Sequence, residues 1–249
     1  MLVTSSANPR IKLIRKLQRS RRERQDSGLF FVEGLRLVGE AMQLQAGIET
    51  LVVAPQLLTS PFGKELVERG KSLGIEVLEV SPSVFVEISV KEGPQGIGAL
   101  VRQHWEPLPS IHPQAGDLWI ALDSIADPGN LGTILRTGDA VGGRGIILLD
   151  HSTDPYEASS WRASMGAIFS QKIARASLEE FAQWVKETGV AVVGTSDKAE
   201  MDYQAYAYPS PLVLLMGSER LGLLQAHLWL CDQVVSIPMV GRSDSLNLS

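Results

Sequence analysis

Asp123-Ser-Ile-Ala-Asp-Pro-Gly-Asn-Leu-Gly-Thr-Ile-Leu-Arg-Thr-Gly-Asp-Ala-Val-Gly142 is the stretch around which the rest of the chain is organised. It follows a short apolar run at residues 118–122, which is typical of a buried strand. Asp127-Pro-Gly marks a turn, and Asn130 is a good N-cap for the apolar residues that then recur at helical spacing. The stretch therefore predicts a strand, a turn and a helix. In parallel sheets ligands bind where strands end in this way.

Asn130 and Arg136 are the polar side chains of this stretch that could face a ligand. Six residues correspond to about 600° of helical rotation, so two side chains inside the helix would point about 120° apart. Because Asn130 is expected at the cap and Arg136 is long, the two could still bracket a ligand beside the first turns. An ordinary capped helix with a solvated arginine fits this segment, taken alone, slightly better.

Composition bounds the class of protein. The chain has 249 residues, of which 44% are hydrophobic and 20% charged, so it can form one large domain or two. No apolar run reaches the roughly 20 residues of a membrane span, and residues 1–12 contain no signal-peptide core. The single cysteine, Cys231, excludes an internal disulfide, and the four histidines show no metal spacing. We expect a cytoplasmic protein without a metal.

The net charge of −5 hides a basic block near the N-terminus. Residues 10–24 contain a single acid, Glu23, and apolar residues at helical spacing, which predicts one amphipathic basic helix. Such a block favours binding of a polyanion, although a membrane surface or a solvated helix face are alternatives. Its eight basic residues are Arg10, Lys12, Arg15, Lys16, Arg19, Arg21, Arg22 and Arg24.

The first 103 residues predict a small α/β unit. Strands are expected at 29–33, 48–53, 75–80 and 97–101, and helices at 34–46, 63–73 and 82–89. Residues 104–117 contain three prolines and little periodicity, so we expect a linker there.

The second half alternates strands and helices. Strands are expected at 118–122, 145–149, 190–194, 212–216 and 233–237, and helices at 130–141, 156–163, 177–188 and 219–229, with residues 165–173 left open. The strands are continuous apolar runs, which is typical of parallel strands buried on both faces. Ser177 and Glu180 form a capping box.

Small or polar residues follow most of these strands, as at Gly194-Thr195, Gly217-Ser218-Glu219 and Ile237-Pro238-Met239. No G-x-G-x-x-G follows a strand and no P-loop is present, which weakens a dinucleotide-dependent oxidoreductase as an interpretation. Each signal alone is weak, because capped helices and polar tails have similar sequences.

Taken in order, three motifs resemble those of the SpoU (TrmH-like) branch of the SPOUT RNA methyltransferases. They are Asn130-x-Gly132-x-x-x-Arg136, Gly217-Ser218-Glu219-x-x-Gly222-Leu223, and Ile237-Pro238-Met239 followed by Ser245-Leu246-Asn247-x-Ser249. The first half is similar to that family's L30e-like substrate-binding domain. The resemblance is carried there by residues 5–10, the basic helix, Phe31-Val32-Glu33-Gly34 and Pro94-Gln95-Gly96.

The resemblance implies transfer of a methyl group from S-adenosyl-L-methionine to a ribose 2′-hydroxyl of structured RNA, either ribosomal or transfer RNA. The two-domain layout favours ribosomal RNA, by analogy only. The implied fold is an L30e-like α/β domain at 1–103, a linker at 104–117, and a parallel-sheet SPOUT domain with a trefoil knot at 118–249. The implied assembly is a homodimer with its active site near the subunit interface.

The resemblance also implies roles for single residues. Gly217, Ile237, Leu246 and Met239 would contact the cofactor, with Thr195 nearby. The catalytic and RNA-facing group would be Asn130, Arg136, Glu219, Ser245 and Asn247. Because a guanidinium is hard to deprotonate, we expect Arg136 to orient the hydroxyl and stabilise developing charge rather than act as a base.

Two expectations qualify this interpretation. A non-catalytic RNA-binding protein that keeps the same scaffold is the alternative, and the presence of all the motif residues argues against it. The family also has a C-terminal helix after the third motif, whereas this sequence ends inside the motif at Ser249. We expect that helix to be missing here, either because the sequence is a piece of a longer one or because the helix is absent.

Overall fold

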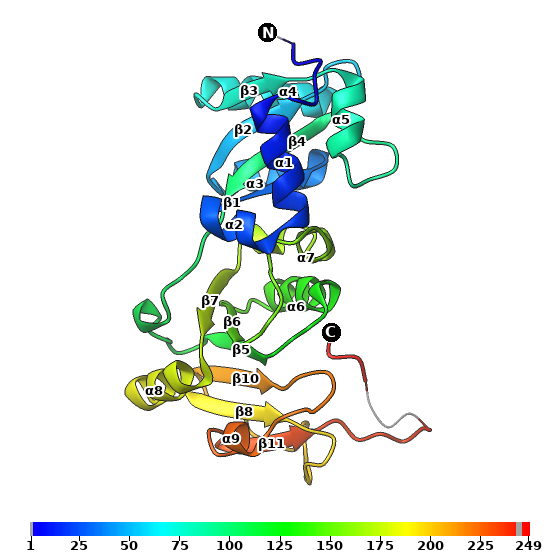
Figure 1. The fold of residues 1–249 in the computed structure, drawn as a ribbon. Coiled ribbons are helices and arrows are strands. Elements are labelled where there is room, and N and C mark those ends of the chain that lie inside the picture. The colour runs from blue at the N-terminus through cyan, green and yellow to red at the C-terminus, as the bar shows by residue number, and fades with distance from the viewer. Residues whose placement is uncertain (1, 243–245) are drawn as a thin grey trace. The chain divides into compact units, whose positions relative to one another are not determined.

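A computed structural model describes residues 2–242 and 246–249 (Figure 1). The chain forms two compact units. The first comprises the residues up to Gln103 together with Asp154–Ser170, and the second comprises His104–Thr153 and the residues from Gln171 onward. The segment 154–170, which the sequence analysis placed in the second half, therefore packs with the first unit. No helix among the described residues is long and apolar enough to cross a membrane.

The first unit is built on a four-stranded sheet. Its order is β1 (Leu29–Glu33), β4 (Ile97–Arg102), β2 (Ile48–Val53) and β3 (Glu76–Glu79). β4 is antiparallel to both of its neighbours, whereas β3 is parallel to β2. The four strands predicted for the first half are thus confirmed, with ends that differ by at most one residue.

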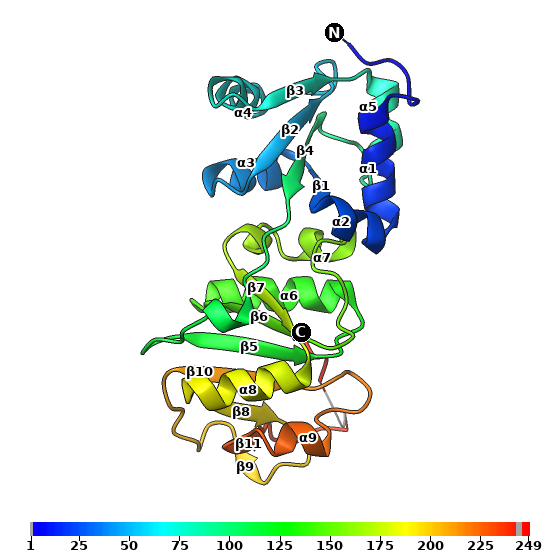
Figure 2. The ribbon, with the colours of Figure 1, turned by 60° about the vertical axis from the view of Figure 1, so that its left-hand side comes forward.

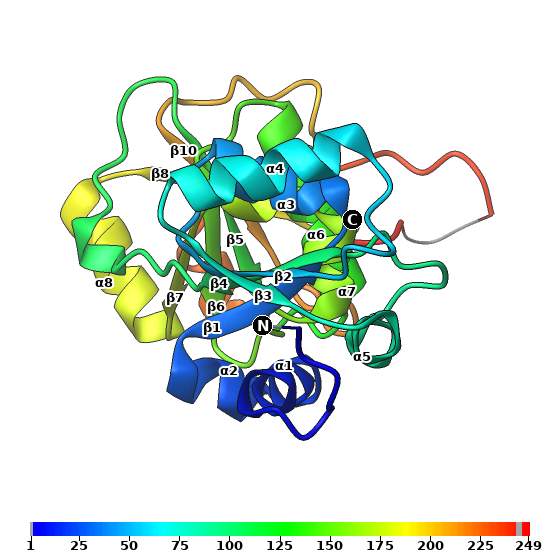
Figure 3. The ribbon, with the colours of Figure 1, turned by 90° about the horizontal axis from the view of Figure 1, so that it is seen from above.

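Helices cover both faces of this sheet (Figures 2 and 3). α1 (Pro9–Arg19) and α5 (Pro82–Ile88) pack on one face, and α3 (Leu35–Gln43) and α4 (Pro61–Ser72) on the other. The remaining elements of the unit are α2 (Arg21–Ser27), α7 (Ala158–Ala163) and a short 3₁₀ turn, η2 (Ala167–Phe169). Burial of apolar side chains such as Ile14, Phe85 and Leu100 forms the core between α1, α5 and the sheet.

The basic block forms two helices rather than the single helix predicted. Ser20 has extended backbone angles and separates α1 from α2. Its hydroxyl accepts a hydrogen bond from the Glu23 backbone N–H, so it caps the second helix. A serine with this capping role breaks a helical pattern that the spacing of apolar residues alone does not interrupt.

The second unit is built on a seven-stranded sheet in which every pairing between strands is parallel, as predicted. Its order is β7 (Lys172–Ala176), β6 (Gly145–Leu149), β5 (Leu118–Asp123), β10 (Leu212–Met216), β8 (Ala191–Thr195), β11 (Gln233–Ser236) and β9 (Met201–Asp202). The five predicted strands are confirmed, while β7 occupies part of the stretch left open and β9 was missed.

α6 (Pro128–Ala140) and α8 (Leu178–Thr188) cover opposite faces of this sheet (Figure 3). The predicted capping box at the start of α8 is confirmed. Trp184 of α8 lies in the core, and its indole N–H donates to the Ile111 carbonyl at 2.9 Å. Leu108, in the 3₁₀ turn η1 (Leu108–Ser110), is buried in the same core, so the stretch expected to be a linker is an integral part of the second unit.

Two helix starts in the second unit differ from the predictions. The N-cap of α6 is Asp127, whose carboxylate accepts from the Asn130 backbone N–H at 2.8 Å, so Asn130 lies in the first turn of the helix. The helix predicted at 219–229 is only α9 (Gln225–Leu228). Residues before it form a tight turn, in which the Gly222 N–H donates to the Ser218 carbonyl and Gly222 has a φ of +62°.

Candidate active site

Three neighbouring strands of the second sheet end at one cavity of about 490 Å³. β8, β10 and β11 are parallel, so their carboxyl ends lie at the same edge of the sheet. The strand ends and the loops that follow them, at 195–198, 216–223, 235–237 and Met239, line the cavity together with residues 246–248. The volume lies within the range of small-molecule and cofactor sites.

The structure places all five predicted cofactor-contacting residues around this cavity. They are Thr195, Gly217, Ile237, Met239 and Leu246. Two members of the predicted catalytic group, Glu219 and Asn247, also line it. Ser245, a third member, lies outside the described residues.

Gly217 is required by the shape of the cavity wall. A Cβ atom at this position would lie 2.1 Å from the Gly222 carbonyl carbon and 2.5 Å from the Leu223 backbone nitrogen. Because both neighbours are backbone atoms, only glycine allows the turn to fold back on the end of β10. The turn thereby presents its backbone to the cavity without intervening side chains.

The cavity combines exposed apolar side chains with a few polar groups. Ile237 is 54% exposed and Leu246 61% exposed, so each leaves much of its apolar surface open to a ligand. Thr195 adds a hydroxyl, and Asp197 and Glu219 add carboxylates. A flat apolar ring with a polar, positively charged tail fits such a lining, which is the chemistry of S-adenosyl-L-methionine.

Glu219 ties the cavity wall to the start of α6. Its carboxylate accepts from the backbone N–H groups of Ala126 at 3.2 Å and Asp127 at 3.4 Å, and from the side-chain amide of Asn130 at 3.4 Å. Partial burial alone would raise the pKa of Glu219, but these hydrogen bonds outweigh it and hold the pKa below its usual value. The ionised carboxylate is therefore an acceptor that positions the loop and α6.

Asn130 continues this connection toward the end of the chain. Its side-chain oxygen accepts from the Ser249 hydroxyl at 3.1 Å, while its amide nitrogen donates to Glu219. Asn130 thus links the second and third sequence motifs, although it does not itself line the cavity.

Arg136 stands apart from this cluster. It lies in the second half of α6, its side chain is exposed, and it makes no hydrogen bond or ion pair with any residue of the described ranges 2–242 and 246–249. It is also absent from the cavity lining. A single chain therefore brings Asn130, Glu219 and Asn247 together but does not add Arg136 to them.

His227 and Asp123 form a buried pair that the sequence analysis missed. The His227 Nε2 lies 3.6 Å from the Asp123 Oδ1, and its Nδ1 accepts from the Leu224 backbone N–H at 2.9 Å. Both residues are buried, so the pair holds the start of α9 against the end of β5. The histidine shows no metal or catalytic spacing in the sequence, and its partner lies about a hundred residues away.

The basic block is largely paired with acids. Arg24 was expected to contact RNA, but it is 3% exposed and its Nε lies 2.7 Å from the Asp154 carboxylate. Four further basic residues form ion pairs with Glu76, Glu87, Glu23 and Asp26; they are Arg10, Arg15, Lys16 and Arg22, respectively. Lys12 and Arg19 are exposed and have no such pair within the part of the chain that the structure describes.

Comparisons with known proteins match both units. Residues 117–249 match the model of the SpoU rRNA Methylase family, and residues 8–99 match the MRM3-like substrate binding domain. A 23S rRNA (uridine(2479)-2′-O)-methyltransferase from Streptomyces viridochromogenes is 32% identical over 98% of this chain and 86% of its own. A 23S rRNA (guanosine(2553)-2′-O)-methyltransferase from Bacillus subtilis is 27% identical over 99% and 94%.

A solved structure extends the match to three dimensions. The AdoMet-bound rRNA methyltransferase from Sinorhizobium meliloti superimposes with a TM-score of 0.90 and 41% identity, covering 100% of this chain and 92% of that one. The family model spans more than half of the chain, so the resemblance drawn from the three motifs is confirmed. The chain belongs to the SpoU rRNA methylase family.

Proposed function

We propose that this protein transfers a methyl group from S-adenosyl-L-methionine to a ribose 2′-hydroxyl of ribosomal RNA. The observation that carries the proposal is the meeting of three strand-end loops at one cavity, in a chain of the SpoU family. The names of the two relatives favour ribosomal over transfer RNA. The proposal includes a cytoplasmic location and the knotted C-terminal fold that the family resemblance implies.

The roles of the residues follow from their chemistry. When bound, S-adenosyl-L-methionine supplies a methyl group on a positively charged sulfur. The backbone of the Gly217–Gly222 turn and the apolar side chains of Ile237 and Leu246 would hold the cofactor in the cavity. Arg136 would orient the ribose and stabilise negative charge on its oxygen. Glu219 acts as a positioning residue because its oxygens are already engaged by α6.

The separation of Arg136 from the cavity supports a homodimer in which one subunit supplies the arginine to the cavity of the other. Several large apolar side chains of the second unit are exposed, as expected of a surface that a second copy covers. Trp229 is 78% exposed, Leu221 71% and Val240 fully exposed. A two-fold dimer would contain two such composite sites.

A mixed dimer tests this arrangement. At a cofactor concentration well below the Kd of Gly217→Ala, the variants Arg136→Ala and Gly217→Ala should each lose nearly all activity alone, and Arg136→Ala should keep its affinity for S-adenosyl-L-methionine. Co-expressed with different affinity tags and purified through both, the mixed dimer has one site with both intact parts, so it should retain about half of the wild-type rate. No activity in the mixed dimer would show that Arg136 acts within its own chain.

A non-catalytic RNA-binding protein is the second candidate, and the isolation of Arg136 within one chain is the observation that favours it. Calorimetry with S-adenosyl-L-methionine separates the two. The methyltransferase should bind it with measurable heat and Gly217→Ala should weaken that binding, whereas a scaffold without the activity should show no heat.

A further inference from the structure

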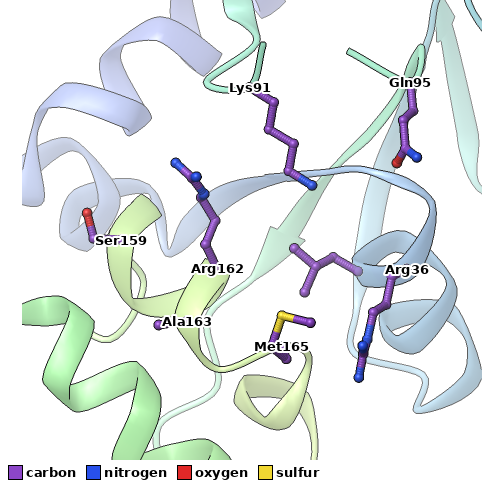
Figure 4. A pocket seen from close by; sticks show the side chains of 8 residues that line it. Arg36, Lys91, Gln95, Ser159, Arg162, Ala163 and Met165 are labelled. Atoms are coloured by element: carbon purple, nitrogen blue, oxygen red, sulfur yellow. The ribbon is translucent and has the colours of Figure 1, made fainter. Parts of the chain in front are cut away.

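A second cavity, of about 610 Å³, lies within the first unit and is lined by three cationic side chains. Arg36 comes from the start of α3, Lys91 from the loop before β4, and Arg162 from α7. In Figure 4 the Lys91 side chain comes down from the loop before β4 and the Arg162 side chain rises from α7, whereas the Arg36 side chain points away from both. The fold brings these cations together from segments that lie up to 126 residues apart in sequence.

Unlike most of the basic block, these cations form no ion pair with a described acid. Arg36, Lys91 and Arg162 are all exposed, and none forms an ion pair or side-chain hydrogen bond with another described residue. Glu33, an acid on which Lys91 and Arg162 act electrostatically, is 2% exposed; burial raises its pKa, although Ser89, Lys91 and Arg162 act in the opposite direction. A protein of net charge −5 thus keeps three unpaired cations around one hollow.

Two first-half motifs to which the proposed activity assigns no role lie beside this cavity, and Gln95 of one of them lines it. Gly34 has a φ of +100°, and a Cβ there would lie 2.9 Å from the Lys91 Nζ. The N-cap residue of α3, Gly34, has no side chain that could cap the helix. Instead the Gln95 side-chain oxygen accepts from the Leu35 backbone N–H at 3.0 Å and caps it. The Glu33-Gly34 and Pro94-Gln95-Gly96 motifs therefore place an ammonium group directly over the start of a helix.

That placement is unfavourable unless an anion is present. The first turn of a helix carries partial positive charge, which stabilises anions and destabilises a nearby cation. Lys91 adds its charge there, and Arg36 and Arg162 add two more. An anion at the start of α3 would accept from the free backbone N–H groups there and from the Lys91 ammonium, while Arg36 and Arg162 add positive charge around the same hollow.

We propose that this cavity binds a backbone phosphodiester of the RNA substrate. The inference rests on the proposed function, because that function makes RNA the ligand of the protein. The three cations are exposed at an open hollow, so they can reach a phosphate that is part of a chain. Elsewhere the net negative charge repels a polyanion, so RNA should be drawn to the place where unpaired cations gather.

Three single variants test the proposal: Arg36→Gln, Lys91→Gln and Arg162→Gln. Each removes a charge from an exposed position, so the fold should be kept. The matched control is Lys64→Gln with Arg69→Gln, which removes two exposed cations from α4 outside the cavity. The measurements are the Kd for a protein-free 23S rRNA transcript over a series of KCl concentrations, the Kd for S-adenosyl-L-methionine, and methyl-transfer kinetics.

Each cavity variant should weaken RNA binding about tenfold and reduce the slope of log Kd against log salt by about one. Affinity for S-adenosyl-L-methionine and kcat at saturating RNA should stay within about twofold of wild type, because the cavity contributes to binding and not to chemistry. RNA affinity and salt slope equal to those of the control would overturn the proposal.

Two further outcomes distinguish an RNA phosphate from a small free anion, and failure of the cavity proposal from failure of the proposed activity. If inorganic phosphate protects wild type but not the variants from thermal unfolding, while RNA binding is unchanged in the variants, the cavity is a small-anion site and the proposal fails. If the cavity variants lose RNA binding but wild type transfers no methyl group, the cavity stands and the proposed activity fails.

Discussion

Substitution of Gly217 by alanine should damage the cofactor cavity more than its small size suggests. The added Cβ would lie 2.1 Å from the Gly222 carbonyl carbon and 2.2 Å from its oxygen. Carbon atoms pack at about 3.5–4.0 Å, so the turn must retreat by more than about 1 Å. Overpacking of this kind costs about 1–3 kcal/mol of unfolding free energy. A displacement of about 1 Å in a positioned site also costs up to about a hundredfold in function.

We therefore expect Gly217→Ala to lower the midpoint of urea unfolding and to weaken binding of S-adenosyl-L-methionine by about tenfold to a hundredfold. Gly241→Ala is the matched control, because a Cβ there meets nothing within 4 Å and its φ is not positive. Its stability should stay within about 0.5 kcal/mol of wild type. Urea titration and calorimetry give both quantities. Gly217→Ala indistinguishable from Gly241→Ala would refute the role assigned to this turn.

The remaining predictions concern single groups. Arg24→Met should destabilise the protein by about 3–5 kcal/mol in urea unfolding, because it leaves the buried Asp154 carboxylate unpaired, and adding Asp154→Leu should recover most of the loss. Folding lowers the pKa of Glu219 from 4.5, so its carboxylate stabilises the fold above that pH. The free energy of unfolding of wild type relative to Glu219→Gln should therefore fall as pH drops through the lowered pKa. Urea unfolding of both proteins over a pH series would show this. Burial raises the pKa of Cys231 to about 11, so iodoacetamide at pH 8 should modify it about a hundredfold more slowly than in the unfolded chain, and equal rates would show that the thiol is not shielded.

The parallel sheet of the second unit could be predicted because its strands are buried on both faces. Runs such as residues 118–122 and 145–149 are apolar throughout, and burial of every residue from 145 to 149 is what such a run requires. The capping box at Ser177 was equally visible, because both of its hydrogen bonds join residues three positions apart. The buried strands and this helix cap are determined by residues close together in the sequence, so the sequence alone predicts them.

The helix expected from Glu219 failed for the opposite reason. The Glu219 carboxylate accepts hydrogen bonds from the backbone of residues 126 and 127, more than 90 positions earlier, and the positive φ of Gly222 closes the turn. No periodicity in 219–229 carries that information. The cap of α6 does have a local signal, since Pro128 directly follows Asp127 and proline favours the first helical position.

The basic residues show the same limit more sharply. A run of cations in 10–24 predicts an RNA-facing surface, but Arg24 is buried against Asp154, 130 residues away. The cavity of Arg36, Lys91 and Arg162 shows no cluster in the sequence at all, because the fold assembles it from three separate segments. Whether a basic side chain is paired with an acid depends on the folded structure, so a high density of basic residues in the sequence does not by itself locate an RNA-binding surface.

The most direct test of the central claim is a map of 2′-O-methyl groups on ribosomal RNA from cells with and without the gene, repeated with the gene carrying Arg136→Ala. A methyltransferase whose chemistry needs the cavity and this guanidinium predicts that a ribose methyl group disappears on deletion. Wild type should restore it and Arg136→Ala should not. An unchanged map on deletion, or full restoration by Arg136→Ala, would contradict the account.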